Sequence, residues 1–325
     1  MELIDTPANP CPPGACLVGA RARDGVVLRA AYWRPERPAR GTVVIAQGRS
    51  EFIEKYFEVI GELLARGYFV VAFDWRGQGL SPRLLRNSAK GHVRRSTDYR
   101  LDLEALIEQV LIPDAPKPWF ALAHSMGAAV LLDFIAASET SAPFQRVVAT
   151  APMLALRGFA ASDYARALAG LLIGCGLSRM FVPGGGRASH FDKPFANNIL
   201  TTDRLRFERS SRLISAFPAL RIGEPTVGWV HAAFRIMDRL ARPGCAEHIK
   251  IPLLMVAAGD ERLVSTPAAE AFARRLKNAD CLVLPGARHE ILMERPEIRA
   301  QFWAAFDAFV PGESLAPATE AANQV

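Results

Sequence analysis

The feature that most constrains the fold of this chain is a regular alternation of short apolar segments with longer amphipathic ones. Short runs rich in β-branched and aromatic side chains, typical of buried strands, occupy residues 26–33, 41–48, 68–74, 118–124 and 146–152. Helical periodicity occupies residues 54–67, 98–112 and 127–137, and residues 1–18 read as an irregular lead-in. Because the connections are short, this order predicts an α/β fold with a mostly parallel central sheet and helices on both faces.

The alternation stops at residue 153 and resumes at about residue 246. The intervening segment holds amphipathic stretches and a glycine-rich turn but no clear strand. Beyond it, strand and helix patterns alternate again over residues 251–259, 267–276, 281–286 and 298–310. We therefore predict one core, residues 1–152 and 246–310, of an α/β-hydrolase type, interrupted by a helical cap over residues 153–245. The tail, residues 311–325, is expected to be disordered.

The composition suits one large folded domain. The chain has 325 residues, of which 50% are hydrophobic and 22% are charged, which is enough for a single core with an insertion. The formal net charge of +6 is explained either by a solvated basic surface or by attraction to anionic lipid headgroups and phosphate-bearing substrates. A nucleic-acid partner is disfavoured, because no basic run is interleaved with aromatic side chains.

Cysteine usage and the first residues of the chain bear on its compartment. The five cysteines are odd in number and widely spaced, so we expect free thiols in a reducing compartment. No histidine–cysteine group has zinc spacing and no phosphate-loop motif is present, so neither a metal nor a cofactor is expected. Acid and proline near the start do not suit a signal peptide, and no apolar run reaches the ~18 residues of a membrane span. We predict a cytoplasmic protein able to sit peripherally on the inner membrane.

One serine stands at a corner between a predicted strand and a predicted helix. In "FALAHSMGAAVLLDF", Ser125 follows the strand 118–124 and precedes the helix 127–137. Such a turn lifts the hydroxyl above the carboxyl edge of the sheet, beside the helix N-terminus. Small residues must flank it, and Gly127 meets that need, while Ala123 replaces the more usual glycine. We interpret Ser125 as a nucleophile, and a serine that merely caps a helix is the alternative.

A nucleophilic serine needs a base, and the base needs an acid that orients it. His289 follows the last predicted strand, in "GARHEIL", and is the best placed of the six histidines. Of the others, His92 is the one expected nearest to the site. The acid comes from "AAGDERLVS", where Asp260 and Glu261 stand side by side, and the residues alone leave the choice between them open. The order serine, acid, histidine is that of hydrolase folds.

Two further loops complete the predicted site. In "AQGRSE", Gly48 allows a sharp turn after a strand, and the backbone amides of Arg49 and Met126 are the predicted oxyanion donors. In "DWRGQG", Asp74 and Arg76 are expected to hold neighbouring loops through hydrogen bonds rather than to act on the substrate.

Five segments together resemble the monoglyceride lipase group of serine α/β hydrolases. They are "DWRGQGLS", "AHSMGAA", "TAPM", "EPTVGWV" and "GARHEIL". The resemblance runs over about residues 24–310, insertion included, where "EPTVGWV" is the more specific signal. In that group the acid stands immediately before Arg-Leu-Val or Arg-Val-Val, which favours Glu261 over Asp260. One departure is Gln47, which stands where the group has histidine before the glycine of the oxyanion loop.

The resemblance implies an ester hydrolase of monoacyl lipids, either a lysophospholipase or a monoacylglycerol lipase, that works through an acyl-enzyme. A helical cap over the site would supply the apolar pocket that an acyl chain needs. A small-molecule carboxylesterase or thioesterase with the same triad is the alternative. A non-catalytic binding protein on this fold is disfavoured by the complete set of serine, acid and histidine. The expected partners are an ester substrate and, through the positive charge, an anionic membrane surface.

Overall fold

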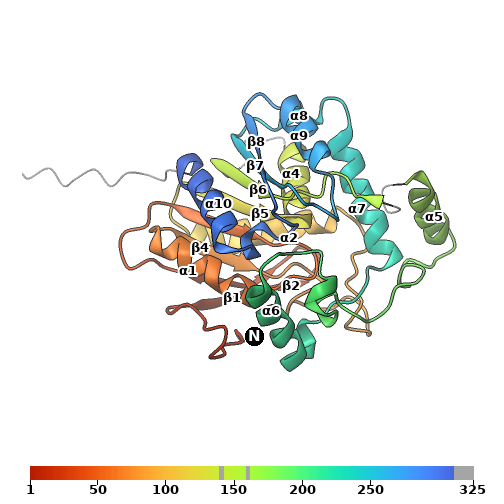
Figure 1. Cartoon of the computed structure of the whole chain (residues 1–325), viewed down its shortest axis with the longest axis horizontal. Helices are drawn as coiled ribbons and strands as arrows, with labels where there is room; N and C mark the ends of the chain where they lie inside the picture. The colour runs from red at the N-terminus through yellow and green to blue at the C-terminus, as the bar shows by residue number, and fades with distance from the viewer. Residues whose placement is uncertain (139–142, 159–161, 311–325) are drawn as a thin grey trace, which may run out of the picture.

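The computed structural model describes residues 1–138, 143–158 and 162–310, and these form one eight-stranded sheet with helices around it (Figure 1). In spatial order the strands are β1 (Cys16–Arg21), β2 (Val27–Trp33), β4 (Phe69–Phe73), β3 (Thr42–Ala46), β5 (Trp119–His124), β6 (Arg146–Thr150), β7 (Leu253–Ala258) and β8 (Ala279–Leu284). The pairs β1–β2 and β2–β4 are antiparallel, and all the other pairs of neighbouring strands are parallel. The predicted mostly parallel sheet is confirmed.

One strand differs from the prediction. β1 begins at Cys16, inside the segment expected to be irregular, and pairs with β2 from Cys16–Tyr32 to Arg21–Val27. It is an edge strand in which only Ala20 is buried. Its short apolar run, CLVGA, contains Gly19, which is unfavourable inside a strand, and follows a segment rich in proline and glycine. The sequence signal for β1 is weak for that reason.

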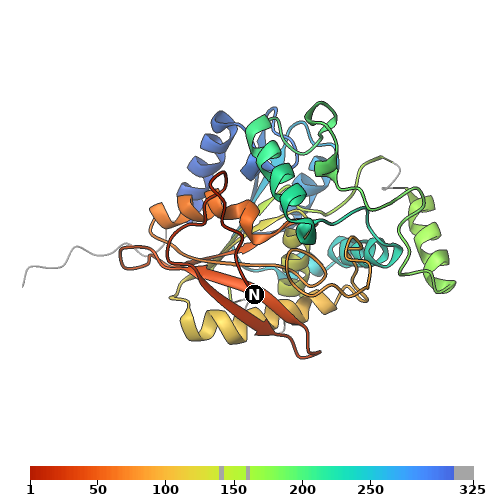
Figure 2. The same cartoon turned by 90° about the horizontal axis from the view of Figure 1, so that it is seen from below.

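Helices cover both faces of the sheet (Figure 2). On one face lie α1 (Phe57–Ala65) and α10 (Pro296–Phe309), which an ion pair between Arg299 and Glu62 joins. The helices of the other face contact one another in sequence: α2 (Asp98–Leu106), α4 (Met126–Ala137), α8 (Cys245–His248) and α9 (Thr266–Arg275). After α2, a π-helical turn (Ile107–Leu111) leads into the short α3 (Ile112–Asp114). Helices on both faces explain why the inner strands are almost wholly apolar.

Between β6 and β7 the described residues form helices and short turns but no strand, as expected from the sequence. The three longer helices there are α5 (Asp163–Gly174), α6 (Arg204–Ala216) and α7 (Val227–Ala241). α7 packs on α4 and joins the main core, whereas α6 joins a smaller apolar cluster with Phe52, from the segment after β3. α5 projects at the edge of the molecule in both views (Figures 1 and 2). The assignment of residues 153–245 as a cap stays a prediction.

Two further expectations concern membranes and the C-terminus. Among the residues that the structure describes, no helix has the length and apolarity to cross a membrane. The tail, residues 311–325, which the sequence predicted to be disordered, lies outside the described residues.

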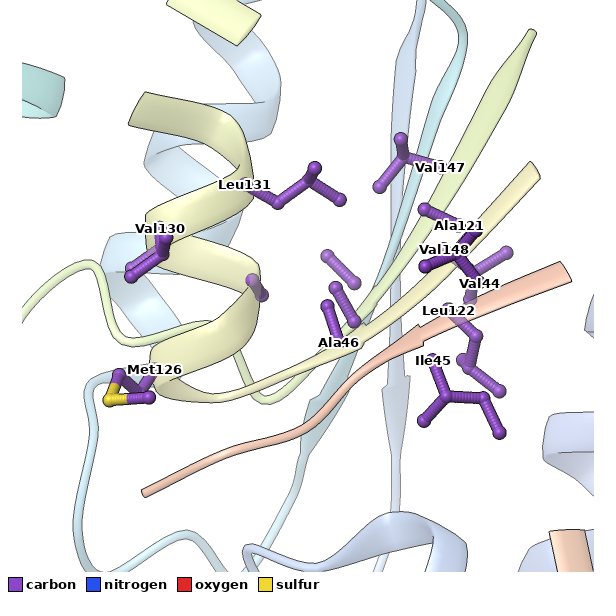
Figure 3. Packing of buried hydrophobic residues seen from close by; sticks show 14 of the residues in the cluster. Val44, Ile45, Ala46, Ala121, Leu122, Met126, Val130, Leu131, Val147 and Val148 are labelled. Atoms are coloured by element: carbon purple, nitrogen blue, oxygen red, sulfur yellow. The ribbon is translucent and has the colours of Figure 1, made fainter. Parts of the chain in front are cut away.

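Helix α4 approaches the central strands closely at its first turn. Figure 3 shows Leu131 of α4 pointing toward the strands, where Ala121 lies. A Cβ added at Gly127 would lie 2.2 Å from the carbonyl oxygen of Ala46 and 2.4 Å from that of Gln47. No side chain fits at such distances. Gly127 therefore allows the N-terminus of α4 to touch the loop that follows β3.

Strained backbone gathers at one edge of the sheet. Within the described ranges, the non-glycine residues with positive φ are Ser50 (64°), Ser125 (49°) and Ala151 (41°). They follow the carboxyl ends of β3, β5 and β6, which are neighbouring strands. Each such residue costs about 1–3 kcal/mol and persists only where the surrounding packing enforces it. This edge of the sheet is therefore the place to look for a functional site.

Gly127→Ala is expected to lower the free energy of unfolding by about 1–3 kcal/mol, because the added methyl group must push α4 away from two carbonyl oxygens. Gly170→Ala is the matched control: it lies inside α5, and its added Cβ would have no neighbour within 4 Å. That change should stabilise by up to about 1 kcal/mol through helix propensity. Urea unfolding measures both, and equal stability of Gly127→Ala and the wild type would contradict the packing argument.

Candidate active site

Ser125 sits in a strained turn between β5 and α4. Its φ is 49° and its ψ is −112°, outside the regions that side chains other than glycine usually adopt. Two backbone hydrogen bonds hold the turn: the Ser125 amide donates to the Thr150 carbonyl (3.0 Å), and the Met153 amide donates to the Ser125 carbonyl (3.1 Å). Both partners lie at the end of β6 or just beyond it. The neighbouring strand thus fixes where the Ser125 hydroxyl points.

A chain of hydrogen bonds joins Ser125 to His289 and His289 to Glu261. The Ser125 Oγ lies 2.9 Å from His289 Nε2, and His289 Nδ1 lies 2.8 Å from Glu261 Oε2. All three residues are buried, with exposures of 7%, 5% and 2%. The structure therefore brings the predicted serine and histidine together with one of the two candidate acids. This is the arrangement in which a histidine removes a proton from a serine hydroxyl.

Glu261, rather than Asp260, is the acid in contact with the histidine. The other carboxylate oxygen of Glu261, Oε1, accepts hydrogen bonds from the amides of Arg262 and Leu263, both at 2.8 Å. The Asp260 side chain is 44% exposed and forms ion pairs with Arg262 (3.1 Å) and Arg288 (3.5 Å). Two adjacent carboxylates thus point in different directions, and only one faces the site.

The ionised state of Glu261 fixes the tautomer of His289. Burial alone would raise the pKa of Glu261, but the hydrogen bond and charge of His289, with the Leu263 and Val264 amides, lower it below its ordinary value. An ionised carboxylate only accepts hydrogen bonds. His289 Nδ1 therefore carries the proton, and Nε2 is left to accept the proton of the Ser125 hydroxyl.

The loop after β3 contains the predicted oxyanion donors. The Gly48 amide donates to Glu51 Oε2 at 2.5 Å, so it is already engaged. The amides of Arg49 and Met126 have no hydrogen-bond acceptor within the described part of the chain. Met126 opens α4, whose N-terminus lies against this loop through Gly127. Two free amides near one serine are what an oxyanion hole requires.

A buried charge network under the site was not predicted from the sequence. The Lys55 ammonium lies 2.7 Å from Glu51 and 2.6 Å from Glu290, and all three side chains are less than a tenth exposed. Burial alone would raise the pKa of Glu51, but the charge of Lys55 lowers it to about 2. Because Glu51 holds the Gly48 amide and Glu290 follows His289, the network ties the oxyanion loop to the histidine loop. The predicted helix over residues 54–67 includes Lys55, but nothing in that pattern indicated this role.

Asp74 and Arg76 make contacts with the loops around them. Asp74 accepts hydrogen bonds from the Gln47 side chain (2.8 Å), the Ile53 amide (3.0 Å) and the Leu80 amide (2.7 Å). Arg76 donates to Asp102 of α2 at 2.7 Å and pairs with Asp24 at 2.5 Å. Neither residue lines the cavity at Ser125. These contacts are of the supporting kind expected from the sequence.

Among the other histidines, His92 was expected to lie nearest to the site, but His124 and His190 lie nearer. His124 packs beside His289, with ring centroids 4.9 Å apart and the ring planes tilted by 58°. Burial lowers the pKa of His124 to about 4, so it is neutral at pH 7. His92 bonds to Thr226 at 3.0 Å and does not line the cavity. His190, which lies in the insertion and was not singled out, does line it. Its place depends on how the insertion folds back, which no local motif reveals.

A cavity of about 360 Å³ opens over Ser125 and His289. Residues of the insertion supply much of its wall, among them His190, Phe191 and Trp229. A second cavity of about 290 Å³ lies between α5 and α7 and is lined by apolar side chains and prolines. Leu156, Pro225 and Trp229 line both cavities. A hydrogen-bonded serine therefore faces a cavity that adjoins an apolar one.

Glu261→Gln is expected to lower kcat for p-nitrophenyl ester hydrolysis by about 10³–10⁴-fold, because the amide cannot hold the same histidine tautomer. Asp260→Asn is the control, since its side chain pairs with arginines away from His289, and it should leave kcat little changed. Thermal unfolding of both variants separates loss of catalysis from loss of fold. Loss of activity in Asp260→Asn with activity kept in Glu261→Gln would reverse the assignment.

Comparisons with known proteins identify the family of this chain. A model of the serine aminopeptidase S33 family matches residues 37–296. Lysophospholipase L2 of Escherichia coli is 31% identical over 293 residues, which cover 85% of this chain and 82% of that protein. Probable lysophospholipase L2 of Haemophilus influenzae is 28% identical over 288 residues, covering 86% of this chain and 87% of that one.

The fold has counterparts among solved structures. A soluble variant of monoglyceride lipase from Saccharomyces cerevisiae, in complex with a substrate analogue, matches with a TM-score of 0.74 at 18% identity, covering 92% of this chain and 96% of that one. The α/β-hydrolase fold predicted from the sequence is confirmed, as is the family resemblance drawn from its motifs. This chain belongs to the serine aminopeptidase S33 family of α/β hydrolases.

Proposed function

We propose that this chain hydrolyses the ester bond of monoacyl lipids, as a lysophospholipase or a monoacylglycerol lipase, with Ser125 as its nucleophile. The observation that carries the proposal is the hydrogen-bonded chain of Ser125, His289 and Glu261 in a cavity that shares its wall with an apolar one. The names of the two bacterial relatives, a lysophospholipase and a probable lysophospholipase, agree with this substrate class.

In the first half of the reaction, the Ser125 oxygen attacks the acyl carbonyl while its proton passes to His289 Nε2. The carbonyl oxygen gains negative charge, which the amides of Arg49 and Met126 stabilise. Glu261 stabilises the imidazolium that forms, without taking its proton. His289 then gives the proton to the leaving glycerol oxygen, and the acyl group stays on Ser125.

In the second half, water replaces the glycerol. His289 Nε2 removes a proton from the water, and the resulting hydroxide attacks the acyl-enzyme carbonyl. The proton returns to the Ser125 oxygen as the ester bond breaks, and a fatty acid leaves. The same two amides serve both halves, because the charge develops on the same carbonyl oxygen each time.

The apolar cavity between α5 and α7 suits the acyl chain. Its wall includes side chains from both helices: Ala165, Leu168, Ala169, Leu172, Val227, Val230 and Phe234. Each methylene that it buries contributes about 0.8 kcal/mol, or roughly fourfold in binding. A small-molecule esterase would gain nothing from such a space, so the cavity favours lipid substrates over the carboxylesterase and thioesterase alternatives.

Ser125→Ala should abolish hydrolysis of every ester tested, by on the order of 10⁶-fold, while the protein keeps its unfolding temperature. With the wild type, kcat/KM for p-nitrophenyl esters should rise from two carbons to twelve and then level off when the cavity is full. Lysophosphatidylcholine and monoacylglycerol should both be hydrolysed. Residual activity in a clean Ser125→Ala preparation would reject the nucleophile.

Two neighbouring leucines of α5 allow a controlled test of whether the apolar cavity binds the acyl chain. Leu172→Trp fills the cavity and should lower the ratio of twelve-carbon to two-carbon kcat/KM. Leu171→Trp changes the neighbouring side chain, which is 64% exposed and does not line the cavity, and should leave the ratio alone. Equal rates on short and long esters in the wild type would favour a general esterase instead.

We further propose that α5 rests on an anionic membrane surface. Tyr164 and Leu171 lie on its outer side with exposures of 81% and 64%, and Met180 beyond the helix is 52% exposed. Exposed apolar side chains on one helical face suit the boundary between lipid headgroups and acyl chains. The nearby Arg179 and Arg187 are also exposed, and basic residues are drawn to anionic lipids.

Leu171→Asp is expected to weaken binding to vesicles that contain anionic phospholipid, measured by co-sedimentation, without changing hydrolysis of a soluble short ester. Wild-type binding should fall as salt rises, because surface attraction is screened with a Debye length of about 8 Å at physiological ionic strength. Undiminished vesicle binding by Leu171→Asp would place the contact elsewhere. Binding that does not change with salt would show that the exposed arginines do not contribute to the membrane contact.

A further inference from the structure

Three arginines line the cavity over Ser125: Arg49, Arg157 and Arg262. Arg262 is paired with Asp260 at 3.1 Å, and Arg157 is exposed and bonds to the backbone carbonyl of Glu261. Arg49 lies deeper, on the oxyanion loop itself. No carboxylate of the described residues lies within ion-pair distance of its guanidinium. A cation with no carboxylate in direct contact thus lines the cavity over Ser125, and the nearest acidic influence on it is that of Glu224, which lines the same cavity.

The contacts of Arg49 hold its side chain without neutralising it. Its Nη2 donates to the Gly223 carbonyl at 2.7 Å, and its Cζ lies 4.9 Å from the centre of the Trp229 ring. Its Nε is buried with no hydrogen-bond partner, as is the hydroxyl of the adjacent Ser50. Burial lowers the pKa of Arg49 to about 10, with Glu224 opposing the shift. The guanidinium therefore remains charged at neutral pH.

Arg83 shows what a purely structural buried arginine looks like in this protein. Burial lowers the pKa of Arg83 to about 10 as well. Arg83 also has one buried nitrogen without a hydrogen-bond partner, Nη1. However, Arg83 donates to two carbonyls, those of Ser88 (3.0 Å) and Ala219 (2.6 Å), and so ties a loop of the core to the insertion. It does not line the cavity. Burying a charge costs free energy unless hydrogen bonds or opposite charges stabilise it. The direct contacts that stabilise the Arg49 guanidinium within the described residues are one carbonyl and one aromatic ring.

The position of Arg49 relative to the reacting ester points to a ligand group. Its backbone amide is a predicted oxyanion donor, so its side chain starts beside the ester carbonyl. Trp229, beneath its guanidinium, also lines the apolar cavity, which would take the acyl chain. In a monoacyl glycerophospholipid, three glycerol carbons separate the ester oxygen from the phosphate oxygen. The phosphate would therefore lie within reach of one long side chain from the carbonyl.

We propose that the Arg49 guanidinium binds the phosphate of a monoacyl glycerophospholipid, and that this contact selects phospholipids over neutral monoacylglycerols. The proposal rests on the proposed function. Guanidinium groups bind phosphate through paired, charge-assisted hydrogen bonds. A monoacylglycerol has only a hydroxyl at that place and leaves the cation unpaired. Arg49 thus acts twice, through its amide on the carbonyl and through its side chain on the headgroup.

The test is a ratio of two activities, so that any general damage to the oxyanion loop cancels. We expect Arg49→Met to lower the ratio of kcat/KM on dodecanoyl lysophosphatidylcholine to that on monododecanoylglycerol by about 10- to 100-fold. Arg83→Met, the matched buried arginine outside the cavity, should leave the ratio unchanged. An unchanged ratio in Arg49→Met would overturn the proposal, while hydrolysis of neither lipid by the wild type would overturn the proposed function instead.

A binding measurement makes the proposal independent of catalysis. The probes are two ethers that cannot be hydrolysed, 1-O-dodecylglycerophosphocholine and 1-O-dodecylglycerol, titrated calorimetrically into the full chain below their micelle concentrations. The wild type should bind the phosphate-bearing ether more tightly, and Arg49→Met should lose that preference while Arg83→Met keeps it. Equal affinity of the wild type for both ethers would refute the proposal. Tight binding of inorganic phosphate alone, lost in Arg49→Met, would identify a free-phosphate site and also overturn the headgroup assignment.

Discussion

The strained turn at Ser125 is the constraint on which the rest of the site depends. A φ of 49° at a residue with a side chain is unfavourable, so the turn must be held by what surrounds it. The Thr150 carbonyl and the Met153 amide hold it from β6, and Gly127 lets α4 press against the end of β3. The same packing that enforces the strain also sets the serine oxygen 2.9 Å from His289. The geometry proposed for catalysis thus follows from the packing of the core.

Beneath that turn, charges rather than apolar contacts set the position of the loops. Lys55 lies between Glu51 and Glu290, and a buried cation between two carboxylates is far less costly than any of the three alone. Glu51 in turn holds the Gly48 amide, which orients the chain so that the next amide, that of Arg49, is left without a partner. The network therefore decides which backbone donor is free to act on a substrate.

The sequence predicts those parts of the site that are local, and fails where the answer depends on distant packing. Ser125, Gly127 and His289 could be identified because a strand end and a tight turn already determine their place. The residues alone left the choice between Asp260 and Glu261 open, and only the family resemblance favoured Glu261, since the choice depends on which carboxylate pairs with Arg262 and Arg288. His190 and Lys55 carried no signal, because long-range folding of the insertion and the loop after β3 brings them to the site. β1 was missed because its short apolar run contains Gly19 and directly follows the turn-forming segment "CPPGA".

The departure at Gln47 shows how the oxyanion loop is supported without the usual histidine. The Gln47 amide nitrogen donates to both the Phe73 carbonyl and Asp74, so one side chain joins β3 to the end of β4. The Trp75 indole donates to the Gln47 carbonyl at 2.8 Å and anchors the backbone from the same side. The amide oxygen of Gln47 is buried with no partner, which costs about 1–3 kcal/mol. That cost is tolerated because the two hydrogen bonds that Gln47 donates fix the end of β3, just before Arg49. With the start of the loop fixed in this way, the backbone amide of Arg49 can face one part of a substrate and its side chain another.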